Sequence, residues 1–211
     1  MIAAALLFAA APASTATDAE RAFAADAQRI GQWSAFRKYA DKDAVMFTPQ
    51  AAWARDFLRG RKDPPRAISW RAAVSYVSCD GRTAVNSGPW FGVGGHVGGT
   101  FNTVWQKGAA GWRWVYDGGG PLTGSAARAG APAIRRASCA GKPKGAPITP
   151  PPPLSTHKAE VAKADNGRGE SADRTLGWDW QVDAHGTRRF RLFQWTGRRY
   201  VQVLTRHARA R

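Results

Sequence analysis

Two side chains of this sequence lie where general acid–base chemistry could be performed. His96 lies in the glycine-rich stretch 92–99, and functional residues are frequent in loops of this kind. Asp117 follows the aromatic-rich run 111–116. A histidine or a carboxylate in an apolar pocket can remove a proton beside a carbonyl group. The alternatives remain open: an exposed loop histidine, and an aspartate that begins a turn.

Aromatic side chains are the second pointer to function, because the chain has 10 tryptophans among 211 residues. Aromatic rings line pockets for apolar or cyclic ligands, but they also fill the cores of small domains, and both interpretations stay open. The residues expected to line a ligand pocket are Trp33, Phe36, Thr48, Trp53, Trp70, Trp105 and Trp114. The four histidines and two cysteines lack metal-ligand spacing, so we expect neither a metal nor another cofactor.

Charge is the third pointer, since the net charge is +16 and the pI is near 11.0. Such a charge favours association with anionic partners, and aromatic residues alternate with arginines near the C-terminus. The expected polyanion surface consists of Arg188, Arg189, Arg191, Arg198 and Arg199. The partner would be nucleic acid or, for an exported protein, an anionic component of the cell envelope. The alternative is a basic, solvated face without a partner.

The first 16 residues have the pattern of a secretory signal peptide, although no Lys or Arg precedes the apolar run 2–11. That run is too short to cross a bilayer, so we expect no membrane segment in the mature chain and a periplasmic or secreted location. A buried helix of a cytosolic protein is the alternative. In an exported protein the pair Cys79 and Cys139 predicts a disulfide, with two unpaired thiols as the alternative.

The elements that must position these residues begin with a helix. Thr17 and Glu20 have capping-box spacing, which predicts a helix from there to about Tyr39. Thr48, followed by proline, predicts the start of a second, short helix that ends at Gly60.

The period then changes to two, which predicts strands. A strand is expected across 68–76 with every second side chain, including Trp70 and Tyr76, on one face. Asp80 and Gly81 predict a hairpin to a strand at 83–90, and strands at 100–106 and 112–117 follow. Trp112, Trp114 and Tyr116 are likewise expected to share a face; no internal repeat is recognised.

The proline-rich segment 121–171 has few large apolar residues and predicts a disordered linker. The remaining segment, 172–211, predicts a small basic β-meander with strands at 176–182, 188–195 and 199–204. The predicted organisation is therefore a signal peptide at 1–16, one domain at 17–120, the linker and the meander.

Four stretches resemble the SnoaL-like and nuclear-transport-factor-2-like superfamily, in particular its exported bacterial members of unknown function. They are DAVMFTP at 43–49, SCDG at 78–81, GTFNTVW at 99–105 and GWRWVYD at 111–117, and the likeness covers about residues 18–120. The resemblance implies an α+β fold, a cone-shaped roll of helices on a strongly curved, largely antiparallel sheet. It also implies a pocket between helices and sheet, and homodimers that form through the sheet.

The superfamily includes ketosteroid isomerases and polyketide cyclases, whose base is an aspartate just before a proline. In this chain that position is Thr48, and a threonine hydroxyl is no general base near neutral pH. We therefore expect an exported, non-catalytic domain that binds a small apolar ligand or a partner. The alternatives are a cyclase or isomerase that uses His96 or Asp117, and polyanion binding through the basic C-terminal segment.

Overall fold

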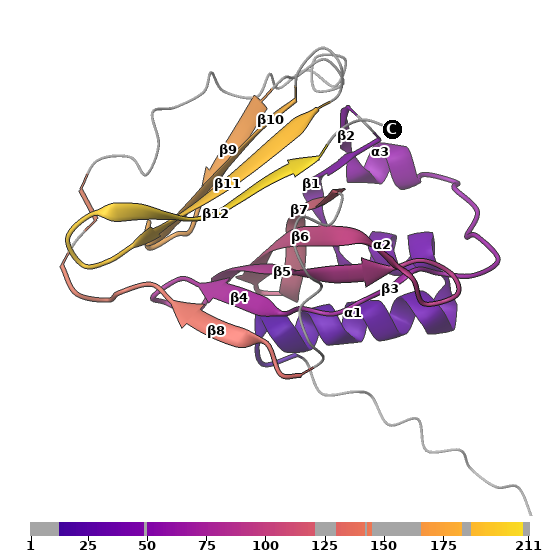
Figure 1. Cartoon of the computed structure of the whole chain (residues 1–211), viewed down its shortest axis with the longest axis horizontal. Coiled ribbons are helices and arrows are strands. Elements are labelled where there is room, and N and C mark those ends of the chain that lie inside the picture. Colours follow the sequence, from indigo (N-terminus) through magenta and orange to yellow (C-terminus); the bar gives the residue numbers. More distant parts are fainter. Residues whose placement is uncertain are drawn as a thin grey trace, which may run out of the picture.

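The computed structural model describes residues 13–48, 50–120, 130–141, 143–144, 166–182 and 187–208. The fold is α+β: a large mixed sheet carries helices on one face and a second, smaller sheet on the other (Figure 1). Residues 1–12 of the expected signal peptide, Pro49 and most of the expected linker lie outside the described residues. No described helix is long and apolar enough to cross a membrane.

Helix α1 spans Ala16–Ile30 and is capped by Thr15. The Asp18 N–H donates to Thr15 Oγ1 at 3.1 Å, and the Thr15 N–H donates to Asp18 Oδ2 at 3.2 Å. The predicted capping box of Thr17 and Glu20 is therefore wrong, because Glu20 belongs to the buried face of the helix. Two residue pairs with capping-box spacing overlap here, Thr15 with Asp18 and Thr17 with Glu20, and the burial of Glu20 decides between them.

The expected single long helix is interrupted at Gly31, whose φ of +102° favours glycine. A second helix, α2, then spans Gln32–Tyr39. The Asp63 carboxylate lies where a side chain at position 31 would start, 2.3 Å from an ideal Cβ. It accepts the Ser34 N–H at 2.9 Å, so it satisfies a backbone donor in the first turn of α2.

The large sheet has eight strands in the order β2-β1-β7-β6-β5-β4-β8, with β3 paired to β5. Pairing is antiparallel except between β1 and β7 and between β4 and β8. The strands are β1 Ala40–Phe47, β2 Ala51–Trp53, β3 Ser69–Trp70, β4 Val74–Val77, β5 Thr83–Phe91, β6 Val97–Gly108, β7 Gly111–Gly120 and β8 Ala133–Arg136. The short helix α3 spans Ala54–Leu58, later than predicted from Thr48, because Ala51–Trp53 pair with β1 as a strand.

Two predictions of shared faces are wrong because the strands are irregular. The predicted strand 68–76 is broken into β3 and β4, so Trp70 packs toward the helices whereas Tyr76 packs toward the second sheet. A register shift between β6 and β7 separates Trp114 from Tyr116 in the same way. In a regular strand successive side chains alternate between the two faces of the sheet, and a break or register shift interrupts this alternation.

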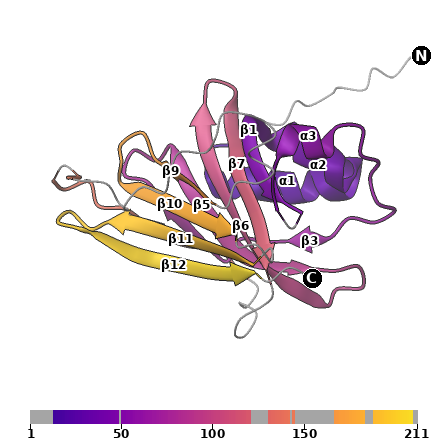
Figure 2. The same cartoon turned by 90° about the horizontal axis from the view of Figure 1, so that it is seen from above.

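The second sheet consists of β9 Asn166–Glu170, β10 Leu176–Val182, β11 Arg188–Trp195 and β12 Tyr200–Ala208, in the order β12-β11-β10-β9. It packs on the large sheet through a shared apolar layer that includes Val85, Val104, Trp180 and Phe190. Figure 2 shows the two sheets beside each other, with the helices on the side of the large sheet that faces away from the second sheet. The face of the large sheet opposite the helices is thus covered by the chain's own second sheet.

Strands β8 and β9 lie inside the range 121–171 that the sequence predicts as linker. In β9 the glycines Gly167 and Gly169 face the second sheet's tryptophans: ideal Cβ atoms would meet Trp180 at 2.5 Å and Trp178 at 2.2 Å. Glycine gives no strand signal, so this strand depends on its partner β10.

The β4–β5 and β9–β10 hairpins repeat one loop design, which sequence inspection missed. The loops are 78–83 (SCDGRT) and 171–176 (SADRTL). In each, the serine hydroxyl donates to the aspartate Oδ1 at 2.6 Å. In each, the same hydroxyl accepts the backbone N–H five residues on at 3.0 Å. Each hairpin is followed by two further antiparallel strand pairings, so the second sheet repeats the topology of β4–β7.

The predicted disulfide between Cys79 and Cys139 is present, with the two Cα atoms 5.2 Å apart. It fixes one end of the segment 130–141, called the strap below. The Ala137 N–H donates to Val77 O at 2.8 Å, and the Ser138 N–H donates to Trp195 O at 3.0 Å. The strap is therefore attached to both sheets.

Candidate functional site

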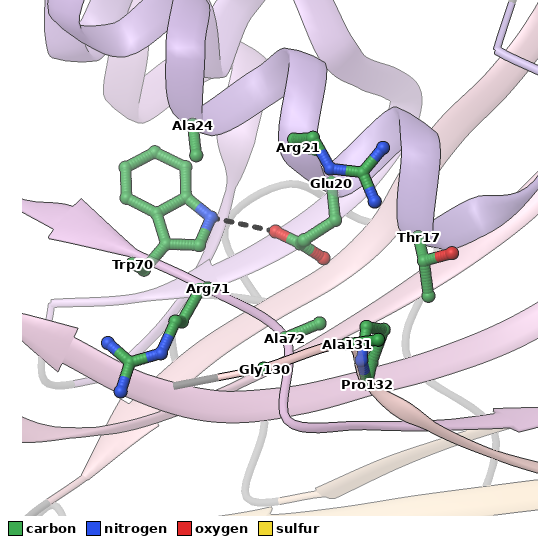
Figure 3. Close-up of a pocket in the computed structure, with 10 residues that line it drawn as sticks. All are labelled: Thr17, Glu20, Arg21, Ala24, Trp70, Arg71, Ala72, Gly130, Ala131 and Pro132. Atoms are coloured by element: carbon green, nitrogen blue, oxygen red, sulfur yellow. Dashed lines mark hydrogen bonds between the residues drawn. The ribbon is translucent and has the colours of Figure 1, made fainter. Parts of the chain in front are cut away.

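The candidate site is a pocket beside the first half of α1, with Glu20 at its floor (Figure 3). Glu20 is 1% exposed and lies on the helix face that buries Ala16, Ala19 and Phe23. It is therefore a carboxyl group in a position that the helix period reserves for an apolar residue.

Three hydrogen-bond donors, one each from β3, β5 and β6, hold the Glu20 carboxylate. The Trp70 indole donates to Oε1 at 2.8 Å, and the Trp105 indole donates to Oε2 at 2.7 Å. The Asn86 amide donates to Oε2 at 3.1 Å. These bonds lower the pKa of Glu20, but burial outweighs them and raises it to about 7, with a further contribution from the charge of Asp117.

A row of polar side chains crosses the large sheet beneath α1. Ser75, Asn86, Thr103 and Asp117 lie opposite one another in β4, β5, β6 and β7. Thr103 Oγ1 donates to Asp117 Oδ2 at 2.7 Å, and burial raises the pKa of Asp117 to about 6. Within the described residues, Ser75 Oγ and Asn86 Oδ1 are buried without a hydrogen-bond partner.

The pocket has a volume of about 320 Å³ and opens between α1, the β3–β4 connection and the strap. Two arginines flank the carboxyl group at its floor (Figure 3). The lining residues are Thr17, Glu20, Arg21, Ala24, Trp70, Arg71, Ala72, Gly130, Ala131 and Pro132.

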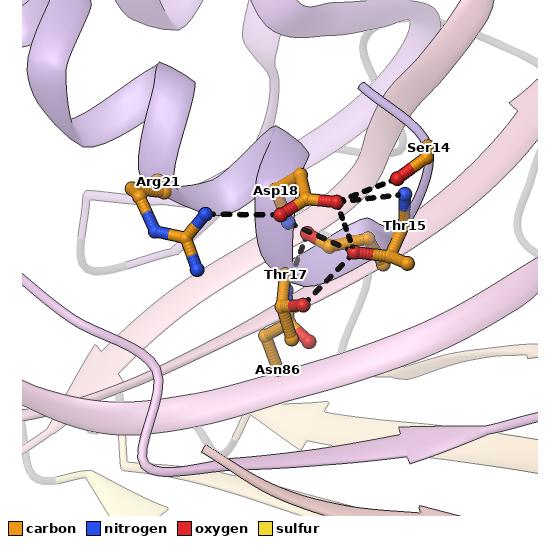
Figure 4. Close-up of polar contacts among 7 residues, drawn as sticks. Ser14, Thr15, Thr17, Asp18, Arg21 and Asn86 are labelled. Carbon is orange, nitrogen blue, oxygen red and sulfur yellow. Dashed lines mark hydrogen bonds and ion pairs between the residues drawn. The ribbon is translucent and has the colours of Figure 1, made fainter. Parts of the chain in front are cut away.

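The two arginines are held by different contacts. Arg21 pairs with Asp18 at 2.9 Å, next to the helix cap (Figure 4). Hydrogen bonds from Thr15 and Ser14 lower the pKa of Asp18 to about 2, so this partner is ionised at any physiological pH. Arg71 lies over the ring of Phe91, 4.7 Å from its centroid.

Of the two predicted acid–base residues, only Asp117 lies near Glu20. His96 is exposed on the β5–β6 loop, where it contacts Gly92. A second hollow of about 490 Å³ adjoins that loop, and it is lined by the end of α1, residues 64–67, Ser69 and 92–95.

Most of the residues expected to line a ligand pocket pack against each other instead. Phe36, Trp70 and Trp105 surround Phe23 with ring centroids 4.8, 4.7 and 6.0 Å from it, in edge-to-face contact. Trp114 is fully buried beside Phe36. The space between helices and sheet is thus filled by rings.

The remaining pocket candidates lie elsewhere. Trp33 packs on Phe36 and Phe57 at the edge of this layer. Trp53 packs toward the second sheet, and Thr48 is exposed. Trp70 is the member of the expected set that lines the pocket.

Three of the five candidate polyanion arginines make contacts within the protein. Arg188 donates to Gly119 O and lies over the Phe47 ring, 4.1 Å from its centroid. Arg191 pairs with Asp179, and Arg189 donates to Gln181. Arg198 and Arg199 are exposed in the β11–β12 turn.

Sequence reasoning missed Glu20, although a signal was present. Ala16, Ala19, Phe23 and Ala27 recur at helical spacing, and Glu20 falls on the same face. The capping-box interpretation assigned Glu20 to the helix cap, so its place on the apolar face was overlooked. No group of three or more potential metal ligands occurs in the described parts of the chain.

Comparison with solved structures shows several partial likenesses, and two of them are given below. No family description matches the sequence, and no curated protein is similar to it. A "putative aromatic ring hydroxylase" from Novosphingobium aromaticivorans is 15% identical, with 51% of this chain and 86% of that chain covered and a TM-score of 0.37. The CamKII hub homology domain from Chlamydamonas reinhardtii is 19% identical, with 50% and 94% covered and a TM-score of 0.37.

Proposed function

We propose that this chain is a non-catalytic domain that binds a small polar molecule in the Glu20 pocket. The observation that carries the proposal is the buried Glu20 carboxyl group at the floor of a cavity of about 320 Å³. Cavities of this size that contain a few polar groups suit small ligands. The aromatic rings from which an apolar ligand was expected fill the interior instead, and charged side chains line the pocket.

Binding is favoured over catalysis because Glu20 is already well occupied as an acceptor. Its three hydrogen bonds come from donors of the core, and they favour the ionised form, so they make Glu20 a weaker base than an equally buried carboxylate without such donors. Thr48, the position expected for a base, is exposed and follows the end of β1, whereas Glu20 lies on α1.

One observation supports the enzyme alternative, a cyclase or isomerase that abstracts a proton. Glu20 and Asp117 have pKa values of about 7 and about 6, both raised by burial, which is the range suited to proton transfer near neutral pH. In that alternative Glu20 is the base, because it lines the pocket.

We further propose membership of the SnoaL-like and nuclear-transport-factor-2-like superfamily, and a periplasmic or secreted location. Helices on one face of a large mixed sheet support the first proposal. The disulfide between Cys79 and Cys139 supports the second, because disulfides persist in oxidising compartments.

A fragment screen by protein-observed NMR tests the binding function. Ligands should shift the amide signals of residues 70–72 and of Gly130 and Ala131. In the Ala131→Trp variant the new side chain fills the pocket from its exposed wall and should abolish these shifts. Ala133→Trp is the matched control, since Ala133 is exposed on β8 but does not line the pocket. The proposed function would be overturned if the screen found no fragment whose shifts are lost in Ala131→Trp and kept in Ala133→Trp.

A further inference from the structure

Exposed apolar side chains gather at one end of the molecule. In the described parts of the chain, the exposed large apolar side chains are Ile30, Val93, Val97 and Ile134. The first three belong to the two elements that meet at the hollow of about 490 Å³, the end of α1 and the β5–β6 hairpin (Figure 1). We call these three side chains, together with Arg66 on the wall of the hollow, the hairpin surface.

The tip of the hairpin carries an apolar side chain on a backbone that bonds to itself. The Gly92 N–H donates to His96 O and the Gly95 N–H donates to Gly92 O, each at 3.0 Å. Val93 lies within this closed turn and is exposed. Because backbone donors of the turn are satisfied internally, the tip can leave water at a smaller cost than an open loop.

Aromatic side chains lie at the base of the same hairpin. Trp90 and Phe91 end β5, and both are half-buried. Tryptophan is enriched where proteins meet the headgroup region of a bilayer, since its ring is apolar and its N–H is polar. An exposed valine beyond a tryptophan is therefore suited to shallow insertion into lipid.

The charge of this end complements an anionic bilayer. Arg66 is exposed, and none of the described residues that line the hollow is acidic. The acid nearest in sequence, Asp63, is directed to α2, where its carboxylate accepts the Ser34 hydroxyl at 2.6 Å. Basic residues close to an anionic membrane strengthen binding, and the net charge of +16 adds long-range attraction.

We propose that the hairpin surface docks on a bilayer that contains anionic phospholipid. Val93 and Val97 enter the headgroup region, and Arg66 and the Ser69 hydroxyl, which both line the hollow, donate to lipid phosphate. This contact is separate from the Glu20 pocket, which adjoins the first half of α1. It assigns to a different surface the anionic envelope component that the C-terminal arginines were expected to bind.

The test is co-sedimentation of the full, oxidised chain with vesicles. Equal parts of phosphatidylglycerol and phosphatidylcholine should bind it at least about tenfold more tightly than phosphatidylcholine alone. Val93→Ser/Val97→Ser should weaken binding to the anionic vesicles about tenfold, because four methyl groups no longer leave water. Ile134→Ser is the matched control, exposed but on β8, and should change binding less than about twofold. Arg66→Gln should weaken binding about fivefold, and the exposed Arg198→Gln less than about twofold.

A label at the tip separates insertion from attraction by charge. The two native cysteines are joined in the disulfide, so a polarity-sensitive fluorophore reacts with Val93→Cys or with Ile134→Cys at the new thiol alone. On anionic vesicles the emission should move to shorter wavelength for the label at 93 and stay unchanged for the label at 134. Heparin, a polyanion without an apolar phase, should bind the valine variant and the unmodified chain equally. Equal responses of the two labels, equal weakening by the valine and Ile134→Ser variants, or no binding to anionic vesicles overturns the proposal.

Discussion

The backbone N–H of Asp80 donates to the Asp173 carboxylate at 2.7 Å, so two loops of the same design touch at matching residues. Next to this bond the Cys79 N–H donates to Thr175 Oγ1 at 2.8 Å. The contact joins the β4–β5 hairpin of the large sheet to the β9–β10 hairpin of the second sheet. It also lies beside the disulfide, at the end of the strap.

The repeated loop predicts opposite effects for two substitutions. Gly81 and Arg174 occupy the same loop position, with φ values of +70° and +60°. A left-handed conformation costs a residue with a side chain about 1 kcal/mol. Arg174→Gly should therefore raise the free energy of unfolding by up to about 1 kcal/mol, and Gly81→Ala should lower it by a similar amount, in urea titrations. A large loss of stability in Arg174→Gly would show that its side chain matters more than its backbone conformation.

The raised pKa of Glu20 predicts that stability falls as pH increases. The group's ordinary value is 4.5 and its folded value is about 7, so between these pH values the folded protein holds a proton that the unfolded chain has released. The free energy of unfolding should decrease by roughly 3 kcal/mol across this range. Asp117, raised from 3.8 to about 6, acts in the same direction at slightly lower pH.

Glu20→Gln should flatten this pH dependence, at the cost of a lower stability below pH 5, since one indole loses its acceptor. The exposed Asp43→Asn is the matched control and should keep the slope of the unmodified chain. Unfolding in urea at several pH values gives the measurement. A slope unchanged by Glu20→Gln would contradict the assignment of this pH dependence to Glu20.

Reduction of the disulfide should loosen the strap before it affects the rest of the protein. The bond spans 60 residues, and its loss should lower the free energy of unfolding by about 2–4 kcal/mol. Hydrogen exchange of the Ala133 and Ala137 amides, which bond to Ala73 O and Val77 O, should accelerate most. Reductant should shift electrophoretic mobility and melting of the native chain but not of the Cys79→Ser/Cys139→Ser variant; identical behaviour of both would argue against the bond.

The glycines of β9 should resist substitution. Because Trp178 occupies the space of a side chain at position 169, Gly169→Ala must displace an indole of the layer between the sheets. We expect a loss of about 1–3 kcal/mol from overpacking in urea titrations. Gly108→Ala is the control, as nothing lies within 4 Å of its ideal Cβ, and its effect should be small. Equal effects would mean that the second sheet tolerates movement of Trp178.

Periodicity and turn residues predicted much of the fold. The loop at Asp80 and Gly81 and strands near β5, β6, β7, β10, β11 and β12 follow from local signals that the tertiary structure leaves intact. The disulfide was predicted from the number of cysteines and the expected export. Local signals failed where a partner supplies the structure: β8 and the glycine-containing β9 exist because β4 and β10 pair with them.

The site was less predictable than the fold. Asp117 was singled out, but Glu20 was assigned to a helix cap, because sequence does not show whether a polar residue in a first turn faces solvent or core. The pocket wall at 130–132 comes from a segment far from α1 in the chain, and its position depends on pairing with β4 and on a disulfide. Contacts between segments so far apart in the chain produce no periodic pattern in the sequence from which they could be predicted.

The order of the two sheets in the chain has a consequence for synthesis. Val85, Val104 and Tyr116 are made before the residues that cover them, which lie between Leu176 and Leu204. A nascent chain that has completed β7 therefore carries a bare apolar sheet face until β10, β11 and β12 have emerged. Premature termination after residue 141 would leave that face permanently uncovered, and such a product should be a chaperone client and a target of proteolysis.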